Sequence, residues 1–314
     1  MIGVASLTVL LVKLVIFVVL LAVGYVGARQ GTLNSGFTKG ASSLLVNIFL
    51  TSSILSSVLG EDRPQMSVGD MFYAFLITTL LLVICYAVAI AVSRTIYRKH
   101  KQSPQIELCI AVMNNLFLGI PVMSASVGSI GVFYIGLSCI SFNLVLYTYG
   151  VWRLVSGTSG AKIKLSDVIT PPLIAGILAG AIFAFDISLP YVLTELINTV
   201  AAGTVPISMI IIGATLGKVS IKDAFTDKVS YVISFFSLIV CPIVTWYLLT
   251  PLTQNNLPLR EACMIMAACP VAAVLTPISV KYGKDPLIVS KSIMVSTVLS
   301  MITLPLLIKI FCNI

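Results

Sequence analysis

Two prolines lie near the middle of long apolar stretches, where a membrane helix would otherwise continue unbroken. Pro121 stands in NNLFLGIPVMSASVG and Pro270 in MIMAACPVAAVLTPISV. Proline inside a helix removes a backbone hydrogen bond and clashes with the preceding turn. In lipid the freed backbone groups are costly unless they line a cavity inside the protein. Interrupted helices at corresponding places in the two halves of a chain therefore indicate the binding site of a secondary transporter.

Polar and flexible residues gather just before the first of these prolines. Asn114 and Asn115 precede Pro121 by one to two turns, and Gly119 would let a ligand or backbone approach closely. Buried amides in a membrane need partners and commonly mark a pathway. A half-helix starting at Pro121 would point free N–H groups and its positive dipole end at the break, where an anion could bind. The alternative is a proline kink whose amides bond to neighbouring helices.

The other candidates are polar or charged residues at single positions. Asn47 in the second predicted span is a candidate for the same site, with a helix-to-helix hydrogen bond as the alternative. Glu107 and Glu195 lie near span ends and are candidates for proton coupling. Lys13 is expected to extend toward the membrane surface or to face a partner helix rather than bind substrate, and Lys291, near the cytoplasmic end of its span, to extend toward the membrane surface. Because no aspartate lies at a span centre, we expect a site without buried acids that favours anions.

The composition requires a membrane to surround these residues. Hydrophobic residues make up 58% of the chain and charged residues 10%, with a mean hydropathy of +1.09; soluble domains carry about 25% charged residues. At about 20 residues per span, 314 residues accommodate about ten helices. We therefore predict an all-α polytopic membrane protein. Its predicted spans are 4–27, 34–59, 69–93, 105–127, 130–155, 167–185, 190–217, 229–250, 260–281 and 286–311.

A flexible connection divides these spans into two sets of five. Residues 1–155 form the first predicted repeat, 156–166 a cytoplasmic linker and 167–314 the second repeat. Since five is odd, the second half must enter the membrane from the opposite side, which makes the repeat inverted. The interrupted helices are then the fourth and the ninth, which are equivalent members of the two halves.

The positive charge of the chain is best explained by its topology. A net charge of +8 would suggest nucleic acid in a soluble protein. Here fourteen lysines and arginines fall in one set of predicted loops and three in the other. Cytoplasmic loops are rich in these residues, so both termini are predicted to be extracytoplasmic in a multi-pass protein of the cell membrane. Nucleic acid is not expected as a partner.

Catalysis and metal binding lack the residues that they need. The one histidine, His100, lies in a basic run, and none of the seven cysteines has CxxC spacing. No paired carboxylates or placed nucleophile occur within the predicted spans. We therefore expect no enzyme, no metal site and no cofactor, apart from a possible coupling Na⁺ or H⁺.

The motifs around both prolines also resemble those of a known family. NNLFLGIP at 114–121 resembles the Asn-x-x-x-Leu-Gly-Ile-Pro signature of the auxin efflux carrier family, which includes plant PIN-formed carriers and bacterial dicarboxylate carriers. Cys269-Pro270, the following Tyr282-Gly283 and the segment STVLSMITLP at 296–305 look like that family's last two spans. The resemblance covers about residues 4–312.

The resemblance implies a fold similar to sodium/proton antiporters and bile-acid symporters. Spans 1, 2, 6 and 7 would form a scaffold domain that dimerises, and spans 3–5 and 8–10 a transport domain that moves by an elevator-like mechanism. The family's site asparagine falls on Asn114, and its crossover prolines on Pro121 and Pro270. Relatives often have a proline where this chain has Thr51. Because the long cytoplasmic loop of plant carriers is absent, the expected substrate is a small organic anion rather than auxin.

Other transport modes remain open at this point. Free carbonyl groups at the breaks could bind Na⁺, so a sodium-coupled symporter of an organic anion or other small solute is the main alternative. A channel or a non-transporting membrane receptor is less favoured, because no filter-like motif and no soluble output domain are found in the sequence.

Overall fold

The computed structural model describes residues 2–59, 63–156, 168–218 and 220–312, and these ranges are helical apart from turns and short irregular segments. The prediction of an all-α protein is confirmed for them. The predicted linker at 156–166 lies, apart from its first residue, outside the described residues. Helices of the first half are α1 (Ile2–Arg29), α2 (Ser35–Leu44), α3 (Thr51–Ser56), α4 (Val68–Thr95), α5 (Ser103–Ala111), α6 (Ile120–Ser126), α7 (Ser129–Val145) and α8 (Val151–Val155).

The described residues of the second half are also mainly helical. Its helices are α10 (Pro171–Ala184), α11 (Tyr191–Ala202), α12 (Thr204–Leu216), α13 (Ile221–Phe225), α14 (Lys228–Phe235), α15 (Cys241–Leu249), α16 (Leu257–Ala267), α17 (Leu275–Lys281) and α18 (Leu287–Phe311). Widened π turns join pairs of helices into longer ones at η1 (Leu45–Leu50), η3 (Leu146–Gly150) and η4 (Phe236–Val240), whereas η2 (Asn115–Gly119) extends α6 at its start.

Five described helices are long and apolar enough to cross a membrane. They correspond to the predicted third, fifth, seventh, eighth and tenth spans: Val68–Thr95, Ser129–Val155, Tyr191–Leu216, Lys228–Leu249 and Leu287–Phe311. The other five predicted spans fall on α1 and on shorter or interrupted helices. The count of ten spans and the inverted repeat therefore stay predictions.

Local sequence explains where several helices begin. Ser67 and Asp70 form a capping box at the start of α4, and Thr170 caps α10 just before two prolines. Asn256 accepts a hydrogen bond from the Leu259 N–H at the start of α16. Such side chains satisfy N–H groups that have no partner within the helix.

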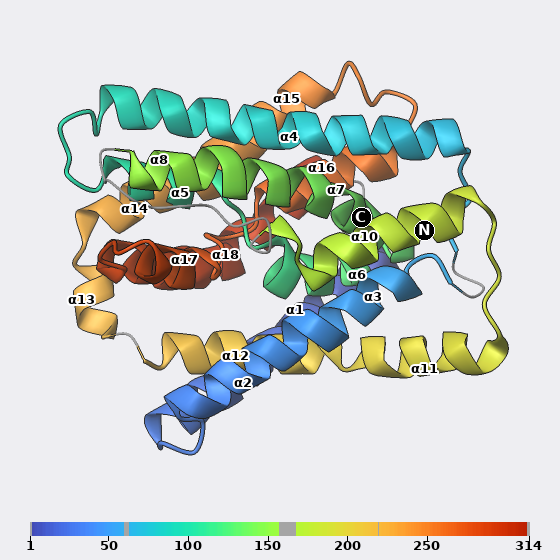
Figure 1. Ribbon diagram of the computed structural model, residues 1–314, viewed down its shortest axis with the longest axis horizontal. Helices are drawn as coiled ribbons and strands as arrows, with labels where there is room; N and C mark the ends of the chain where they lie inside the picture. The colour runs from blue at the N-terminus through green and yellow to red at the C-terminus, as the bar shows by residue number, and fades with distance from the viewer. Residues whose placement is uncertain (1, 60–62, 157–167, 219, 313–314) are drawn as a thin grey trace.

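The helices pack in a slab with distinct edges. Figure 1 shows α4 along one edge of the molecule and α11 and α12 along the opposite edge, with α10, α17 and α18 between them. The helix α1 packs lengthwise on α12, while α11 contacts α3, and α4 contacts α5, α7 and α15. Two short helices, α5 and α16, are buried along most of their length. Each of them ends where a membrane-length stretch of helix is interrupted by non-helical residues.

Glycines set the closest of these contacts. A Cβ atom added at Gly24 of α1 would collide with the carbonyl of Ile210 on α12, and one at Gly213 of α12 with the carbonyl of Leu21 on α1. Small residues at crossings let membrane helices approach this closely. The α1–α12 pair is thus packed backbone against backbone.

Candidate functional site

Two interruptions of helical structure lie side by side. The first follows the end of α5 at Ala111, where Val112 is extended, and the second separates α16 from α17 over residues 268–274. The Asn114 N–H donates to the Pro270 carbonyl at 2.7 Å, and the Ala272 N–H to the Val112 carbonyl at 2.9 Å. Two segments that are far apart in the sequence thus satisfy each other's backbone groups, as a non-helical segment inside a membrane requires.

The structure places the first interruption earlier than the sequence predicted. Pro121 does not start a half-helix, because the helix that contains it begins at Asn115 and runs through η2 into α6. The Ile120 N–H donates to the Asn115 carbonyl, five residues back. This π turn widens the helix just where the proline ring would otherwise meet the preceding turn. Pro270, by contrast, lies in the second interruption itself.

A glycine and a serine hydroxyl stabilise the packing of the two interrupted segments. A Cβ atom at Gly119 would lie 3.3 Å from the Cys269 Sγ atom, so the glycine allows η2 to approach the second interruption. The Val271 N–H donates to the Ser296 hydroxyl oxygen on α18 at 3.1 Å. The second interruption is therefore fixed to α18 as well as to the first.

Both predicted asparagines lie at this junction. Asn114 is 5% exposed and Asn115 is 6% exposed. Asn115 Oδ1 is buried and has no hydrogen-bond partner among the described residues. A buried polar atom without a partner costs about 1–3 kcal/mol, so such an atom is a candidate for binding a ligand or an ordered water.

Asn114 lines two cavities. The smaller, about 110 Å³, lies against α7 and η3 and includes Asn115 and Asn143 in its wall. There Asn143 Oδ1 accepts a hydrogen bond from the Thr170 hydroxyl at 3.2 Å. The larger cavity has a volume of about 970 Å³ and is lined by α2, η1, α12, η2, α17 and α18. It is large enough for a small organic molecule.

The larger cavity combines a polar inner end with charged walls. Thr297 of α18 lines it, is 1% exposed, and its Oγ1 atom has no partner among the described residues. Three lysines and two aspartates also line it: Lys39, Lys218, Lys291, Asp223 and Asp285. Partial burial lowers the pKa of Lys218, which lies beyond the end of α12.

Some predicted residues do not join the site. Asn47 is exposed on η1, donates to the Ser43 hydroxyl oxygen at 3.0 Å, and lines neither cavity, whereas its neighbour Val46 lines both. The π turn at 45–50 changes which face each residue presents, so Asn47 points away. Thr51, at the position where relatives often have proline, donates to the Val46 carbonyl at 3.1 Å. Glu195 is exposed on α11.

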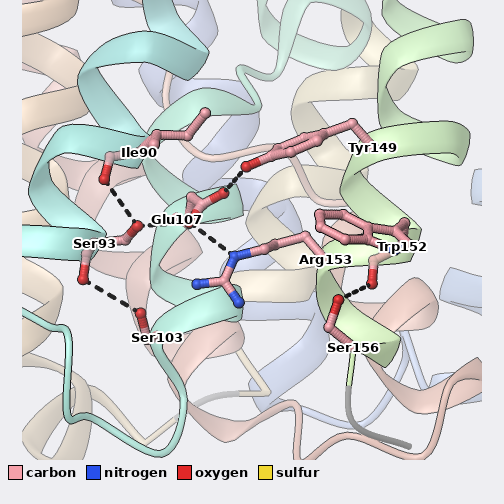
Figure 2. Close-up of polar contacts among 8 residues, drawn as sticks. All are labelled: Ile90, Ser93, Ser103, Glu107, Tyr149, Trp152, Arg153 and Ser156. Atoms are coloured by element: carbon pink, nitrogen blue, oxygen red, sulfur yellow. Dashed lines mark hydrogen bonds and ion pairs between the residues drawn. The ribbon is translucent and has the colours of Figure 1, made fainter. Parts of the chain in front are cut away.

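Glu107 is buried away from both cavities in a polar cluster. Its carboxylate accepts from the Ser93 hydroxyl at 2.5 Å, from the Tyr149 hydroxyl at 2.6 Å and from Arg153 Nε at 3.0 Å. Figure 2 shows these side chains converging on Glu107 from three other elements. The cluster fixes α5, the helix that leads into the first interruption, against α4, η3 and α8.

Comparison with known proteins identifies the class of this molecule. A family model described as membrane transport protein matches residues 155–308, which include the second interruption. The chain belongs to this family. The family membership predicted from the motifs at 114–121, 269–283 and 296–305, that of the auxin efflux carriers, is confirmed.

Relatives within the membrane transport family extend the similarity to the whole chain. An uncharacterized transporter of Methanothermobacter thermautotrophicus is 24% identical over 289 residues, covering 92% of this chain and 94% of its own. An uncharacterized transporter of Methanocaldococcus jannaschii is 22% identical over 302 residues, covering 93% and 95%. The family and the long apolar helices together identify a multi-pass membrane transporter.

Proposed function

We propose that this transporter carries small organic anions, with carboxylates as the substrate class, and binds them at the two paired interruptions. The observation that carries the proposal is the position of these segments at a cavity of about 970 Å³ that is lined by Asn114 and Thr297. Non-helical backbone at membrane depth is tolerated where it is buried in protein or lines a cavity, and transporters place their substrate there.

The chemistry at the interruptions favours an anion. The helix that begins at Asn115 points its positive dipole end and first N–H groups toward Asn114. Asparagine and threonine side chains can donate hydrogen bonds to a carboxylate. The two acids in the cavity wall, Asp223 and Asp285, are both exposed. An anion at Asn114 would therefore meet hydrogen-bond donors, while the two carboxylates that line the cavity lie at exposed positions.

The position of the cavity supports alternating access by an elevator-like motion. One wall comes from α2, η1 and α12, in the predicted scaffold, and the other from η2, α17 and α18, in the predicted transport domain. A displacement of one wall along the other would carry the interruptions across the membrane. By the distribution of lysines and arginines, the cavity described here faces the cytoplasm. We further propose a homodimer formed through the scaffold domain.

Thermal unfolding of the purified protein with acetate, lactate, succinate and citrate tests the proposal. We expect at least one carboxylate to raise the unfolding temperature, because a ligand that binds only the native state stabilises it. Asn114→Ala should abolish this shift and the uptake of the same carboxylate into proteoliposomes. Asn47→Ala is the matched control, since Asn47 lines neither cavity. Stabilisation by a neutral solute alone would contradict the proposal.

Coupling to Na⁺ is a second candidate mode, which the free acceptor atom at Asn115 favours. Its Oδ1 atom is buried in the wall of the smaller cavity without a described partner, and oxygen atoms are the ligands that hard cations prefer. Uptake with and without an inward Na⁺ gradient separates the two modes. In the sodium-coupled case Asn115→Ala should remove the dependence on Na⁺, while in the uncoupled case the gradient should have no effect.

A further inference from the structure

The large cavity contains positive charges that the proposed binding site does not use. Lys39 is on α2, Lys218 lies just after α12, and Lys291 is on α18, so three separate parts of the chain each place one lysine in the lining of the same cavity. None of the three forms an ion pair with another described residue. Lysines on a surface commonly extend into water, but these three line one cavity that Asn114 also lines.

Lys291 is the most buried residue of the five charged residues that line the cavity. It is half-buried, whereas Lys39, Lys218, Asp223 and Asp285 are all exposed. The Asp285 carboxylate accepts a hydrogen bond from the N–H of Leu287, the first residue of α18, at 3.0 Å. The most buried charge in the cavity lining is therefore positive, although the five charged residues together sum to only +1, three lysines less two aspartates.

The helix α18 connects this lysine to the inner end of the cavity. Lys291, Met294 and Thr297 recur at every third residue and all line the cavity, so they lie on one face of α18. Thr297 is six residues from Lys291, about 9 Å along the helix axis. Its buried Oγ1 atom has no described partner. A ligand moving along this face passes from a positive charge to unsatisfied polar groups.

We infer that Lys291, with Lys39 and Lys218 nearer the mouth, makes this cavity an electropositive capture site, and that Lys291 binds a small organic anion before it reaches Asn114. The inference rests on the proposed function, because it assigns a further residue to the same substrate class. A positive field in a narrow cavity raises the local concentration of anions. An ammonium group with no competing carboxylate is free to hold one of them.

A thiol at position 290 measures the charge of the cavity without any substrate. Ser290 lines the cavity on α18, and all seven native cysteines are buried, so Ser290→Cys introduces an accessible thiol. Its reaction rates with an anionic and a cationic methanethiosulfonate reagent are measured in membranes and normalised to a free thiol. We expect the ratio of anionic to cationic rates to exceed one and to fall roughly fivefold or more with Lys291→Gln.

Matched variants separate the charge of Lys291 from its packing. Lys291→Arg should retain the high ratio, because it keeps the charge. Lys309→Gln should also leave it unchanged, since Lys309 is exposed near the other end of α18. If the Lys291→Gln protein does not fold, the Ser290→Cys protein alone is measured at 1 M salt, where the ratio should approach that of the free thiol. A ratio near one, or one that neither Lys291→Gln nor salt changes, would overturn the inference.

Succinate binding then distinguishes this inference from the proposed function. Lys291→Gln should raise the Kd for succinate roughly 10- to 100-fold, the effect of losing a hydrogen bond to a charged group, and Lys291→Arg should raise it less. Succinate binding that Lys291→Gln leaves unchanged would remove Lys291 from the site while the proposed function stands. If the unmodified protein binds no carboxylate, the proposed function fails, and with it the assignment of Lys291 to an organic anion.

Discussion

Glu107 is a buried carboxylate that three side chains from three other elements bind at once. Removing it by Glu107→Ala would leave Arg153 without its partner and the hydroxyls of Ser93 and Tyr149 without their acceptor. Breaking a buried ion pair from one side typically costs about 3–5 kcal/mol. Because Arg153 is 24% exposed in its side chain, we expect about 2–3 kcal/mol, measured as a lower unfolding temperature in detergent.

The variant Glu107→Gln separates a structural role from proton coupling. An amide keeps the shape and part of the hydrogen bonding, so a structural Glu107 predicts a smaller loss of stability and transport that recovers when the protein is stabilised. A coupling site would instead keep its stability and lose its dependence on the proton gradient. The three donors that hold the carboxylate favour the structural role.

At the residue scale the sequence identified the inner polar groups but not the wall of the cavity. Asn114 and Asn115 could be predicted because two amides in an apolar membrane stretch are costly unless they have polar partners or line a pathway. Asn47 has the same chemistry and is exposed, because a π turn changed its direction and no sequence pattern predicts that turn. Lys291 was expected only to extend toward the membrane surface. Its place in the cavity depends on how α2 and α12 pack opposite α18.

The close crossing of α1 and α12 makes a prediction at the scale of the element. Gly213→Ala would drive a methyl group into the Leu21 carbonyl, so the two helices would have to separate. Overpacking of this kind costs about 1–3 kcal/mol. Thermal unfolding in detergent measures the loss. The matched control is Gly180→Ala on α10, where the added Cβ would lie 3.7 Å from Leu137 Cδ2, an ordinary contact; equal losses in both variants would contradict the packing explanation.

At the element scale, hydropathy predicted helices well and prolines predicted the interruptions less well. The five long apolar helices fall within a few residues of predicted spans, because a continuous apolar run in a membrane has few alternatives to a helix. Pro121 lies in the first turn of α6 rather than at the break, since proline is accommodated early in a helix and after a wide turn. The break itself, at 112–114, carries no proline; it is stabilised by hydrogen bonds to the distant segment around Pro270.

At the scale of the whole molecule, the inverted repeat makes a prediction about the side on which each part of the chain lies. If each half contains five spans, the linker at 156–166 must lie on the side opposite to both termini, and the distribution of lysines and arginines places that linker in the cytoplasm. Alkaline phosphatase, which is active only outside the cytoplasm, should therefore be active when fused to the C-terminus and inactive when inserted in the linker. A fluorescent protein that folds only in the cytoplasm should give the reverse pattern. Equal results at the linker and the C-terminus would mean an even number of spans in the second half. Two inverted repeats of five spans each would then be excluded.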